Sequence, residues 1–458
     1  MIKGLLRIMT QTSTSREHHT DLGNAMRLVA QHSEDIRYCG AWKSWLFWDG
    51  LRWNEDETGE VERRAKGTAR GIYSEAASVG NPDDSKPIFE WARQSESESR
   101  IRAMINLAKT EPGIPARVDD LDTDPWLLGV KNGTLNLRTG DVRTACRDDL
   151  ITKLAPVEYN PAAVCPVWER FLSEIFKDGN QQMVQFLQRA VGYSLTADVS
   201  ERVLFILHGG GSNGKTTFLE TIRDLLGDYA EVTSADTLLV KRPGTIPNDL
   251  AALKGARFAL ASEAEQGRRL AEAQVKLMTG GDTIPARRLY GEWFSFRPTF
   301  KIWLATNHKP IIRSDSKAIW DRIRLIPFKV RISDEMQDKG LPRKLREERP
   351  GILAWAVRGC LEWQKCGLGV PAEVRDATAG YQSEMDAFGN FLAECCVLEP
   401  DAWVTTAALR QTYEEWAREN GEQHLLVGSE FAERLRGRWC EPKSRHEGRG
   451  WGGIRLAP

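Results

Sequence analysis

The 458-residue sequence carries almost no net charge, because 63 lysine and arginine residues stand against 64 aspartate and glutamate residues. No overall field marks the chain as a binder of polyanions, so any nucleic-acid surface must be a local patch. No window approaches the roughly 18 uncharged apolar residues of a transmembrane helix. The N-terminus also lacks the apolar stretch and small-residue cleavage site of a secretory signal. We therefore expect a cytoplasmic protein without a membrane partner.

Zinc-binding cysteine pairs are missing as well. The eight cysteines form no C-x-x-C motif, and no histidine stands at zinc-finger spacing from them. Reduced, mostly buried thiols are the better interpretation. Internal repeats and low-complexity tracts are also absent. A charged fraction of 28%, a mean hydropathy of −0.44 and a length of roughly three domains at about 150 residues each indicate a globular protein.

The chain shows no acidic cluster with a histidine on a catalytic domain of its own, which primase chemistry of the archaeo-eukaryotic kind needs. Asp120, Asp122 and Asp124 form an acidic run, but their neighbours indicate a turn before Pro125. We therefore expect a separate primase or polymerase chain to supply any polymerising activity.

A glycine-rich loop follows the apolar run at 203–208 and precedes a helical pattern. The match to G-x-x-x-x-G-K-T between a strand and a helix predicts a phosphate-binding loop. Lys215 should reach the β- and γ-phosphates of ATP, and the Thr216 hydroxyl should hold Mg²⁺. The alternative is a glycine-rich turn that binds nothing. The predicted nucleotide-binding residues are Gly209, Gly210, Gly211, Ser212, Asn213, Gly214, Lys215, Thr216 and Thr217.

Two further strands end in polar residues. The strand at 256–261 leads to Glu263 and Glu265, which face the same side and point toward the phosphates if this strand neighbours the loop strand. One would hold Mg²⁺, with Glu263 the main candidate, and the other would polarise water; alternatively both face solvent. The strand at 300–305 leads to Asn307, either a γ-phosphate sensor or a turn former. Arg322 could serve a neighbour's γ-phosphate or form a surface ion pair.

Two segments are candidates for DNA contact. Alternation in residues 282–300 predicts a β-hairpin, used either for phosphate contact or for subunit packing. The segment from Arg434 to Arg455 holds seven basic and two acidic residues, a local footprint of nucleic-acid binding, with a merely solubilising face as the alternative. Helices at 405–421 and 428–440 followed by ribbon strands predict a winged helix. The predicted DNA contacts are Arg287, Arg288, Lys301, Arg436, Arg438, Lys443, Arg445 and Arg449.

The order of these motifs resembles superfamily 3 helicases of the AAA+ class, in particular poxvirus-type and satellite-phage-type primase-helicases. GGGSNGKTTF, RFALASEAEQGRRL, KIWLATNHKP and AIWDRIRLIPF carry the resemblance. It implies a hexameric ring around DNA, with ATP at each interface and the hairpin in the pore. Lys215 and Thr216 match Walker A, Glu263 the Walker B acid, Asn307 sensor 1, and Arg322 a trans arginine finger. The E-x-E spacing departs from adjacent acids and leaves the two glutamate roles open.

We therefore predict an α/β fold: a P-loop AAA+ domain with a parallel sheet, preceded by a mainly helical region with hairpins and followed by a winged-helix-like domain. The expected divisions are a loosely attached lead-in at 1–40, a helicase-associated region at 41–195, the ATPase core at 196–335, a helical lid at 336–375 and the C-terminal domain at 376–458. The expected function is an ATP-dependent replicative helicase of a phage, prophage or plasmid in a bacterial cytoplasm. An ATP-switched initiator or helicase loader is the alternative, and a protein-remodelling ATPase a weaker one.

Overall fold

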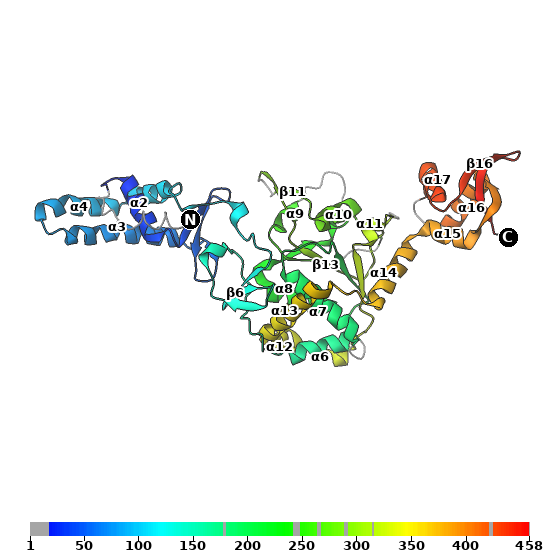
Figure 1. Cartoon of the computed structure of the whole chain (residues 1–458), viewed down its shortest axis with the longest axis horizontal. Coiled ribbons are helices and arrows are strands. Elements are labelled where there is room, and N and C mark those ends of the chain that lie inside the picture. The colour runs from blue at the N-terminus through cyan, green and yellow to red at the C-terminus, as the bar shows by residue number, and fades with distance from the viewer. Residues whose placement is uncertain are drawn as a thin grey trace.

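Three regions follow one another along the molecule: a helical N-terminal region, a central sheet with helices on both faces, and a small C-terminal unit (Figure 1). This computed structural model describes residues 18–176, 180–240, 248–262, 267–287, 292–313, 316–420 and 425–457.

The N-terminal region combines helices with a four-stranded sheet of order β3-β2-β1-β4. Strand β1 runs antiparallel to β2 and parallel to β4. The predicted presence of hairpins in this region is confirmed by the turn at Gly50, on either side of which Trp48 pairs with Trp53. The elements are α2 (Asp21–His32), β1 (Ile36–Cys39), β2 (Ser44–Trp48), β3 (Trp53–Glu55), α3 (Glu60–Ser78), α4 (Pro82–Ser95), α5 (Glu98–Ala108) and β4 (Pro115–Ala116).

Residues 18–40 belong to this folded region. The Thr20 side chain caps α2 by accepting a hydrogen bond from the Gly23 backbone N–H at 3.0 Å. Buried Leu28 of α2 and Ile36 of β1 share one hydrophobic cluster with residues of α3 and α5. The prediction of a loosely attached lead-in is therefore wrong for residues 18–40, because the apolar face of α2 completes the core. Residues 1–17 lie outside the described part of the chain.

A three-stranded antiparallel sheet, in the order β5-β6-β7, connects this region to the centre. Buried polar contacts fasten it to the centre. The Tyr229 hydroxyl accepts from the Gly129 N–H at 2.9 Å, and the buried Arg257 guanidinium donates to the Leu127 carbonyl at 2.6 Å and to the Leu195 carbonyl at 2.7 Å. The strands are β5 (Leu127–Val130), β6 (Gly133–Asn136) and β7 (Asp141–Arg143).

The central sheet has five parallel strands in the order β14-β8-β13-β10-β9, with the strand before the glycine-rich loop second from one edge. Its strands are β8 (Leu204–His208), β9 (Ala230–Ser234), β10 (Phe258–Ser262), β13 (Lys301–Thr306) and β14 (Ile323–Pro327). The interleaved elements are α8 (Lys215–Leu226), α9 (Asn248–Ala252), α10 (Glu272–Gly280), β11 (Ile284–Arg287), β12 (Trp293–Phe296) and α11 (Lys317–Trp320). Short 3-10 turns are η1 (Val118–Asp120), η2 (Arg147–Asp149), η3 (Gly227–Tyr229), η4 (Ala235–Thr237) and η5 (Asp334–Met336).

Alternate residues of the central strands enter two different cores. Phe205 of β8 and Trp303 of β13 join the cluster that includes α6, α7, α8 and α13. Leu204 of β8 and Ile302 of β13 join the cluster on the other face, with α9, α10, α11 and the β11–β12 hairpin. Burial on both faces explains why these strands read as unbroken apolar runs.

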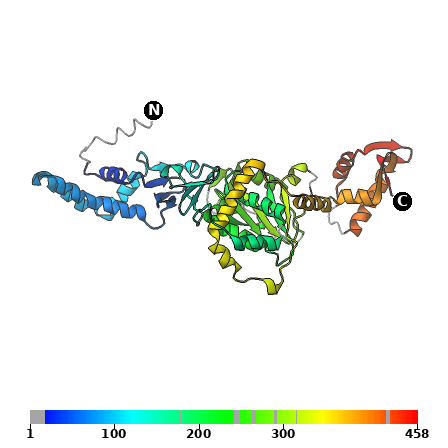
Figure 2. The same cartoon turned by 60° about the horizontal axis from the view of Figure 1, so that its bottom comes forward.

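Helices before and after the sheet in sequence cover one of its faces. In Figure 2, the yellow α13 crosses in front of the sheet. It packs on α7 at a close approach of two glycines: a Cβ added to Gly192 would lie 2.1 Å from the Cys360 nitrogen, and one added to Gly359 would lie 2.0 Å from the Gln188 carbonyl oxygen. The elements are α6 (Pro166–Ile175), α7 (Gln181–Leu195), α12 (Leu341–Glu347) and α13 (Arg349–Cys366).

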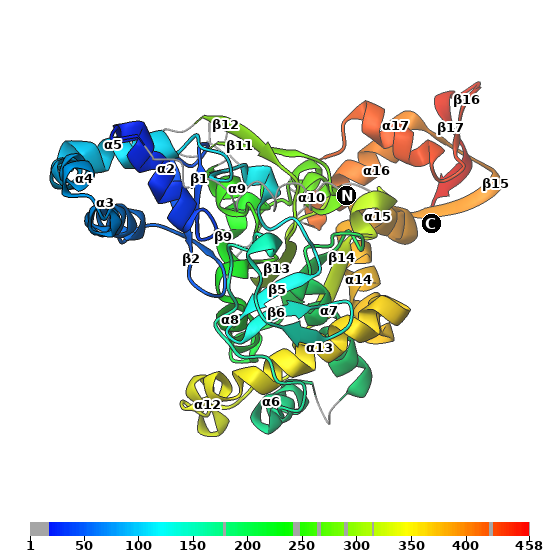
Figure 3. The same cartoon turned by 60° about the vertical axis from the view of Figure 1, so that its left-hand side comes forward.

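The C-terminal unit has its own aromatic core and stands away from the centre at the end of α14 (Figures 1 and 3). Its antiparallel sheet has the order β15-β17-β16. The predicted boundary at 375/376 falls inside α14, whose Tyr381 packs with the central cluster. The elements are α14 (Ala372–Met385), α15 (Ala387–Cys395), β15 (Cys396–Thr405), α16 (Thr406–Glu419), α17 (Gly428–Arg436), β16 (Glu441–Arg445) and β17 (Gly448–Leu456).

All eight cysteines are free thiols and five are buried, as the sequence predicts. Among the helices that the structure describes, none is both long enough and apolar enough to cross a membrane.

Candidate functional site

The loop at residues 209–214 leads from β8 into α8 along a tightly confined path. A Cβ added to Gly209 would lie 2.2 Å from the carbonyl oxygen of Phe328 and 2.6 Å from Nδ2 of Asn213. Gly214, the residue before α8, has φ 85°, a left-handed conformation that favours glycine. By contrast, Gly210 and Gly211 face open space, with no atom within 4 Å of an added Cβ. The loop is packed on its inner side and open on its outer side.

The Lys215 amine lies over this loop. Its Nζ donates to the carbonyl oxygens of Gly209 at 2.6 Å and Gly210 at 3.2 Å, and to Oδ1 of Asn213 at 3.2 Å. The side chain is 6% exposed, and this burial lowers the pKa of Lys215. An anion at the loop would offset the desolvation of the ammonium group.

Asn307 approaches the same amine from a neighbouring strand. Its Oδ1 accepts from Lys215 Nζ at 3.1 Å, although the two residues lie 92 positions apart. The contact arises because β13 pairs directly with β8, with Thr306 opposite His208, so both chains leave the sheet at one edge. The structure therefore brings together two of the predicted site residues.

The loop fits a polyphosphate. Within the described part of the chain, the backbone N–H groups of residues 210–213 donate no hydrogen bond to a protein group, so they remain available to phosphate oxygens. Thr216 is exposed at the start of α8, where its hydroxyl could bind Mg²⁺. Beside it, a cavity of about 280 Å³ separates α8 from α12. It is lined by Thr216, Thr217, Glu220, Thr221, Asp224, Pro342, Leu345, Arg346 and Arg349.

Two polar residues at the loop have contacts or surroundings that the sequence patterns did not indicate. Asn213 is 4% exposed and ties the loop to the end of β14 by donating to the Phe328 carbonyl at 3.3 Å. His208 ends β8 half-buried, and burial, followed by the charges of Lys309 and Lys215, lowers its pKa. Position within the G-x-x-x-x-G-K-T motif was the available signal for Asn213, whereas His208 had none beyond the end of an apolar run.

The acidic strand does not lie where the sequence argument required. Strand β10 ends at Ser262 and pairs with β13 and β9, so β13 separates it from β8. The assumption that it neighbours the loop strand is wrong, although the carboxyl ends of all five parallel strands share one edge. Glu263 and Glu265 lie outside the described residues. Among the described residues, no group of three His, Cys, Asp or Glu side chains is placed to hold a metal ion.

Arg322 lies at the opposite edge of the sheet from the loop. Its carbonyl accepts from the Leu204 N–H at 2.8 Å at the amino end of β8, and its Nε donates to Oγ1 of Thr279 at 3.1 Å. Five strand residues at about 3.3 Å each separate this edge from the loop. Arg322 is thus too far to serve the loop of its own subunit.

The predicted hairpin at 282–300 is confirmed, with Ile284 of β11 opposite Phe296 of β12. Arg287 ends β11, whereas Arg288 and the turn lie outside the described residues. The prediction that Lys301 contacts DNA is wrong. Its side chain is 2% exposed, and its Nζ donates to the carbonyls of Thr196 and Asp198, which follow α7, and of Thr299.

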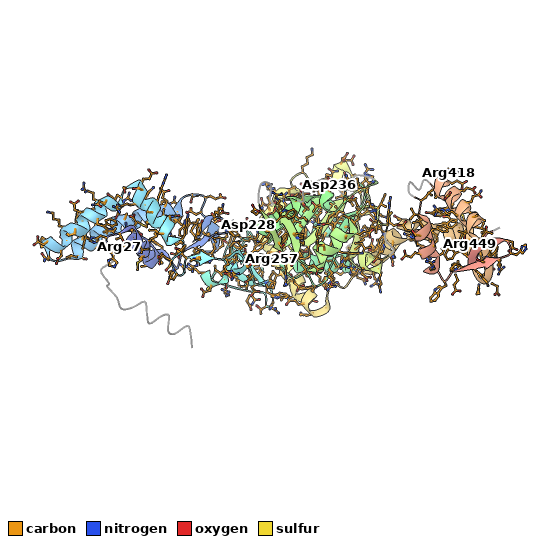
Figure 4. The ribbon with its side chains drawn as sticks, turned by 90° about the horizontal axis from the view of Figure 1, so that it is seen from above. Arg27, Asp228, Asp236, Arg257, Arg418 and Arg449 are labelled. Carbon is orange, nitrogen blue, oxygen red and sulfur yellow. The ribbon has the colours of Figure 1, made fainter. Side chains whose placement is uncertain are left out.

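The basic residues of the C-terminal unit gather on one exposed stretch. Residues 436–439 and 441–449 are all exposed. Within it, Arg438 pairs with Asp386 at 2.9 Å and the Arg445 guanidinium lies 5.4 Å from the Trp403 ring centroid. Figure 4 shows Arg449 in this unit, far from the central region. The predicted DNA contacts in this stretch are Arg436, Arg438, Lys443, Arg445 and Arg449. Trp439 lies in the same stretch, and the sequence patterns did not single it out.

Comparisons with known proteins find two family matches and several viral relatives. Residues 25–177 match the family described as "D5 N terminal like", and residues 207–322 match a family of unknown function (DUF5906). The chain is 28% identical over 468 residues to the protein named "Putative helicase L207/L206" of Acanthamoeba polyphaga mimivirus, covering 92% of this chain and 47% of that protein. It is 27% identical over 511 residues to "Putative helicase 022R" of Frog virus 3, covering 83% and 52%.

A further similarity joins the chain to a protein named as a primase. Over 339 residues it is 22% identical to "Putative primase C962R" of African swine fever virus (strain Badajoz 1971 Vero-adapted), covering 68% of this chain and 35% of that protein. The chain therefore spans about half or less of the length of these relatives. The apo A form of the NrS-1 C-terminal region aligns with a TM-score of 0.48 at 10% identity, covering 89% of this chain and 84% of that one. The family match and the viral relatives support a relationship to D5-like primase-helicases.

Proposed function

We propose that the chain is the ATP-driven helicase part of a replicative primase-helicase, of the superfamily 3 AAA+ class, that serves a phage, prophage or plasmid. The observation that carries the proposal is the bond between Lys215 and Asn307 over an open glycine-rich loop. The bond joins a cation at the start of α8 to an amide directly after β13, beside the loop that is the proposed phosphate site. The viral relatives named as helicases and primases support the same class of function.

The proposed roles follow from the positions of the residues. Backbone N–H groups of 210–213 and the Lys215 ammonium hold the phosphates, and the Thr216 hydroxyl holds Mg²⁺ together with Glu263. Bound ATP supplies the phosphoryl group whose hydrolysis drives movement. Asn307 orients the terminal phosphate, and Glu265 or Glu263 polarises water. Because Arg322 lies at the opposite edge of the sheet, the only nucleotide it could serve is that of a neighbouring subunit, which supports the proposed homohexameric ring.

Element order supports the domain classes. In the order β14-β8-β13-β10-β9 the loop strand lies between the Asn307 strand and the strand after Arg322, and this arrangement supports the proposed AAA+ class. In the C-terminal unit, α15, β15, α16, α17, β16 and β17 follow one another with a three-stranded antiparallel sheet, which supports a winged helix. Its exposed basic stretch, and Arg287 and Arg288 at the hairpin, are the proposed DNA contacts. A separate primase or polymerase is the proposed partner.

The second candidate is an ATP-switched replication initiator or helicase loader that binds DNA without processive unwinding. The exposed basic stretch at residues 436–449 supports it as well as it supports a helicase. Strand displacement on a forked duplex separates the two, because only the helicase continues to unwind as ATP is consumed.

The first experiment measures native mass and ATP hydrolysis, with and without single-stranded DNA, for the wild type and Lys215→Ala. The helicase predicts a species near six times 51.6 kDa with DNA-stimulated hydrolysis. It also predicts that Lys215→Ala abolishes hydrolysis and unwinding but still binds DNA, because the amine contacts the nucleotide loop and Asn307 and none of the proposed DNA contacts. Lys365→Ala, which removes an exposed lysine paired with Glu362 on α13, is the matched control and should behave as the wild type. Unwinding retained by Lys215→Ala would contradict the assignment, and a monomer whose hydrolysis ignores DNA would favour a switch or remodelling ATPase.

A further inference from the structure

Trp439 is the most exposed large apolar side chain in the described part of the chain, with 93% of its surface accessible. It lies on the turn between α17 and β16, directly before Cys440, which is 1% exposed. A tryptophan in a soluble protein normally buries most of its ring, so this exposure needs a reason.

The backbone holds the ring outward. Trp439 has φ 64°, a left-handed conformation that bulky residues rarely adopt. Hydrogen bonds fix the turn: the Trp439 N–H donates to the Arg436 carbonyl at 3.1 Å, and the Cys440 N–H donates to the Leu435 carbonyl at 3.1 Å. With its neighbour anchored in the core and its own N–H bonded to the end of α17, the residue presents its ring to the surroundings. An outlier of this kind is a reason to look for a ligand.

The surroundings of the ring are basic. Arg436 and Arg438 precede it on the same turn, and the β16–β17 hairpin carries three further exposed cations at Lys443, Arg445 and Arg449. The acids of this stretch are Glu441 and Glu447, so the net charge is positive although the whole chain is near neutral. A flat aromatic ring among cations is the combination by which proteins bind single-stranded nucleic acid, since bases stack on the ring while cations follow the phosphates.

We propose that Trp439 stacks on an unpaired base and makes the C-terminal unit a single-strand binding surface. This inference rests on the proposed helicase function and names the form of DNA that the unit holds. Bases of an intact duplex are already stacked, so insertion of the ring there would first have to unstack them. An unpaired base carries no such cost. The unit would thereby hold the DNA single strand that leaves or approaches the proposed hexameric ring.

The test measures fluorescence anisotropy of labelled oligothymidine and of a blunt duplex of equal length, with the full-length chain at several salt concentrations. Trp439→Ala should lose roughly 5- to 100-fold in affinity for the single strand, the range for one stacked base. Trp439→Phe should retain most of the affinity, because it keeps a stacking face. The slope of affinity against salt should not change in either variant, because no charge is removed. Leu398→Ala, which removes an exposed apolar side chain of β15 in the same C-terminal unit, is the control and should bind as the wild type.

Two results would overturn the proposal. One is single-strand affinity in Trp439→Ala equal to that of the wild type; the other is an equal loss on the single strand and the duplex. Thermal unfolding of each variant checks that the unit stays folded. If the alanine variant does not fold, Trp439→Asn carries the test, because asparagine tolerates this backbone conformation and also lacks a stacking face. If the wild type itself binds neither DNA, the proposed function fails, and this outcome differs from a failure of Trp439 alone.

Discussion

The inner wall of the glycine-rich loop makes Gly209→Ala the sharpest test of the site geometry. The added methyl would lie 2.2 Å from the Phe328 carbonyl oxygen and 2.6 Å from Asn213 Nδ2. Neither atom can easily withdraw. The Phe328 backbone is fixed because its N–H donates to the His208 carbonyl at 2.7 Å, and Asn213 is fixed by its bond to the same Phe328 carbonyl. The loop must therefore move by roughly 1 Å to reach an ordinary contact distance of about 3.4 Å.

Such overpacking costs about 1–3 kcal/mol of the free energy of unfolding. In a domain of the size of the central region, each kcal/mol of destabilisation lowers the melting temperature by about 2–4 °C. The displacement also moves Asn213, whose Oδ1 accepts from Lys215 Nζ at 3.2 Å, so the affinity for ATP should fall in the same variant. Thermal unfolding without nucleotide, and ATP binding followed by calorimetry, measure the two effects separately.

Gly210→Ala is the matched control in the same loop. No atom lies within 4 Å of its added methyl, so stability should stay within about 0.5 kcal/mol of the wild type. Its methyl does occupy the open side of the loop, so ATP affinity should still fall if the phosphates bind there. Gly209→Ala that melts and binds ATP as the wild type does would refute the packing argument. Equal destabilisation by both variants would refute it as well.

Two further changes test buried groups. The pKa of His208 lies below 6.5 because of burial and then the charges of Lys309 and Lys215, so the folded chain binds fewer protons than the unfolded chain just below that pH. Its contribution to stability should therefore fall as the pH drops below 6.5, and His208→Gln should flatten that part of the dependence of urea unfolding on pH; an unchanged slope would contradict the assignment. Lys301→Met should lower the free energy of unfolding by about 1–3 kcal/mol, because the carbonyls of Thr196, Asp198 and Thr299 lose their donor. Its DNA affinity at fixed salt should equal that of the wild type, and a marked loss in a folded variant would mean that the amine does reach DNA.

Local sequence patterns were enough to predict most of the secondary structure. Apolar runs and turn residues located β8, β13 and the hairpins because strand burial and turn chemistry depend on neighbouring residues. Apolar residues recur at helical spacing throughout residues 88–111, yet the structure divides this stretch into α4 and α5 at Glu96 and Ser97. The spacing of apolar residues continues unchanged across this break, so periodicity alone could not predict where α4 ends and α5 begins. The polar residues before α2 likewise suggested an exposed segment, although one face of α2 is buried in the N-terminal core.

The errors came from contacts between distant segments. The order of strands depends on which crossover returns to which edge, so the sequence did not indicate that β13 separates β10 from β8. Lys301 opens an apolar strand, and a lysine there is expected at the surface. Its carbonyl partners at Thr196 and Asp198 lie about a hundred residues earlier in the chain, at the end of α7. The sequence around residue 301 gives no indication of these two carbonyl partners.

Strand β14 connects the two places where the proposed mechanism needs a nucleotide. Its amino end follows Arg322, which faces away from the subunit's own loop, and its carboxyl end leads to Phe328, whose carbonyl accepts from Asn213 in that loop. A shift of the loop on nucleotide binding therefore acts on one end of a strand whose other end carries the arginine proposed for the neighbour. The strand is buried on both faces, with Ile323 in one core and Ile326 in the other, so it moves as a unit more readily than it bends. If ATP hydrolysis passes around a ring, β14 is one short path by which one subunit's nucleotide can reposition the arginine proposed to act on the next.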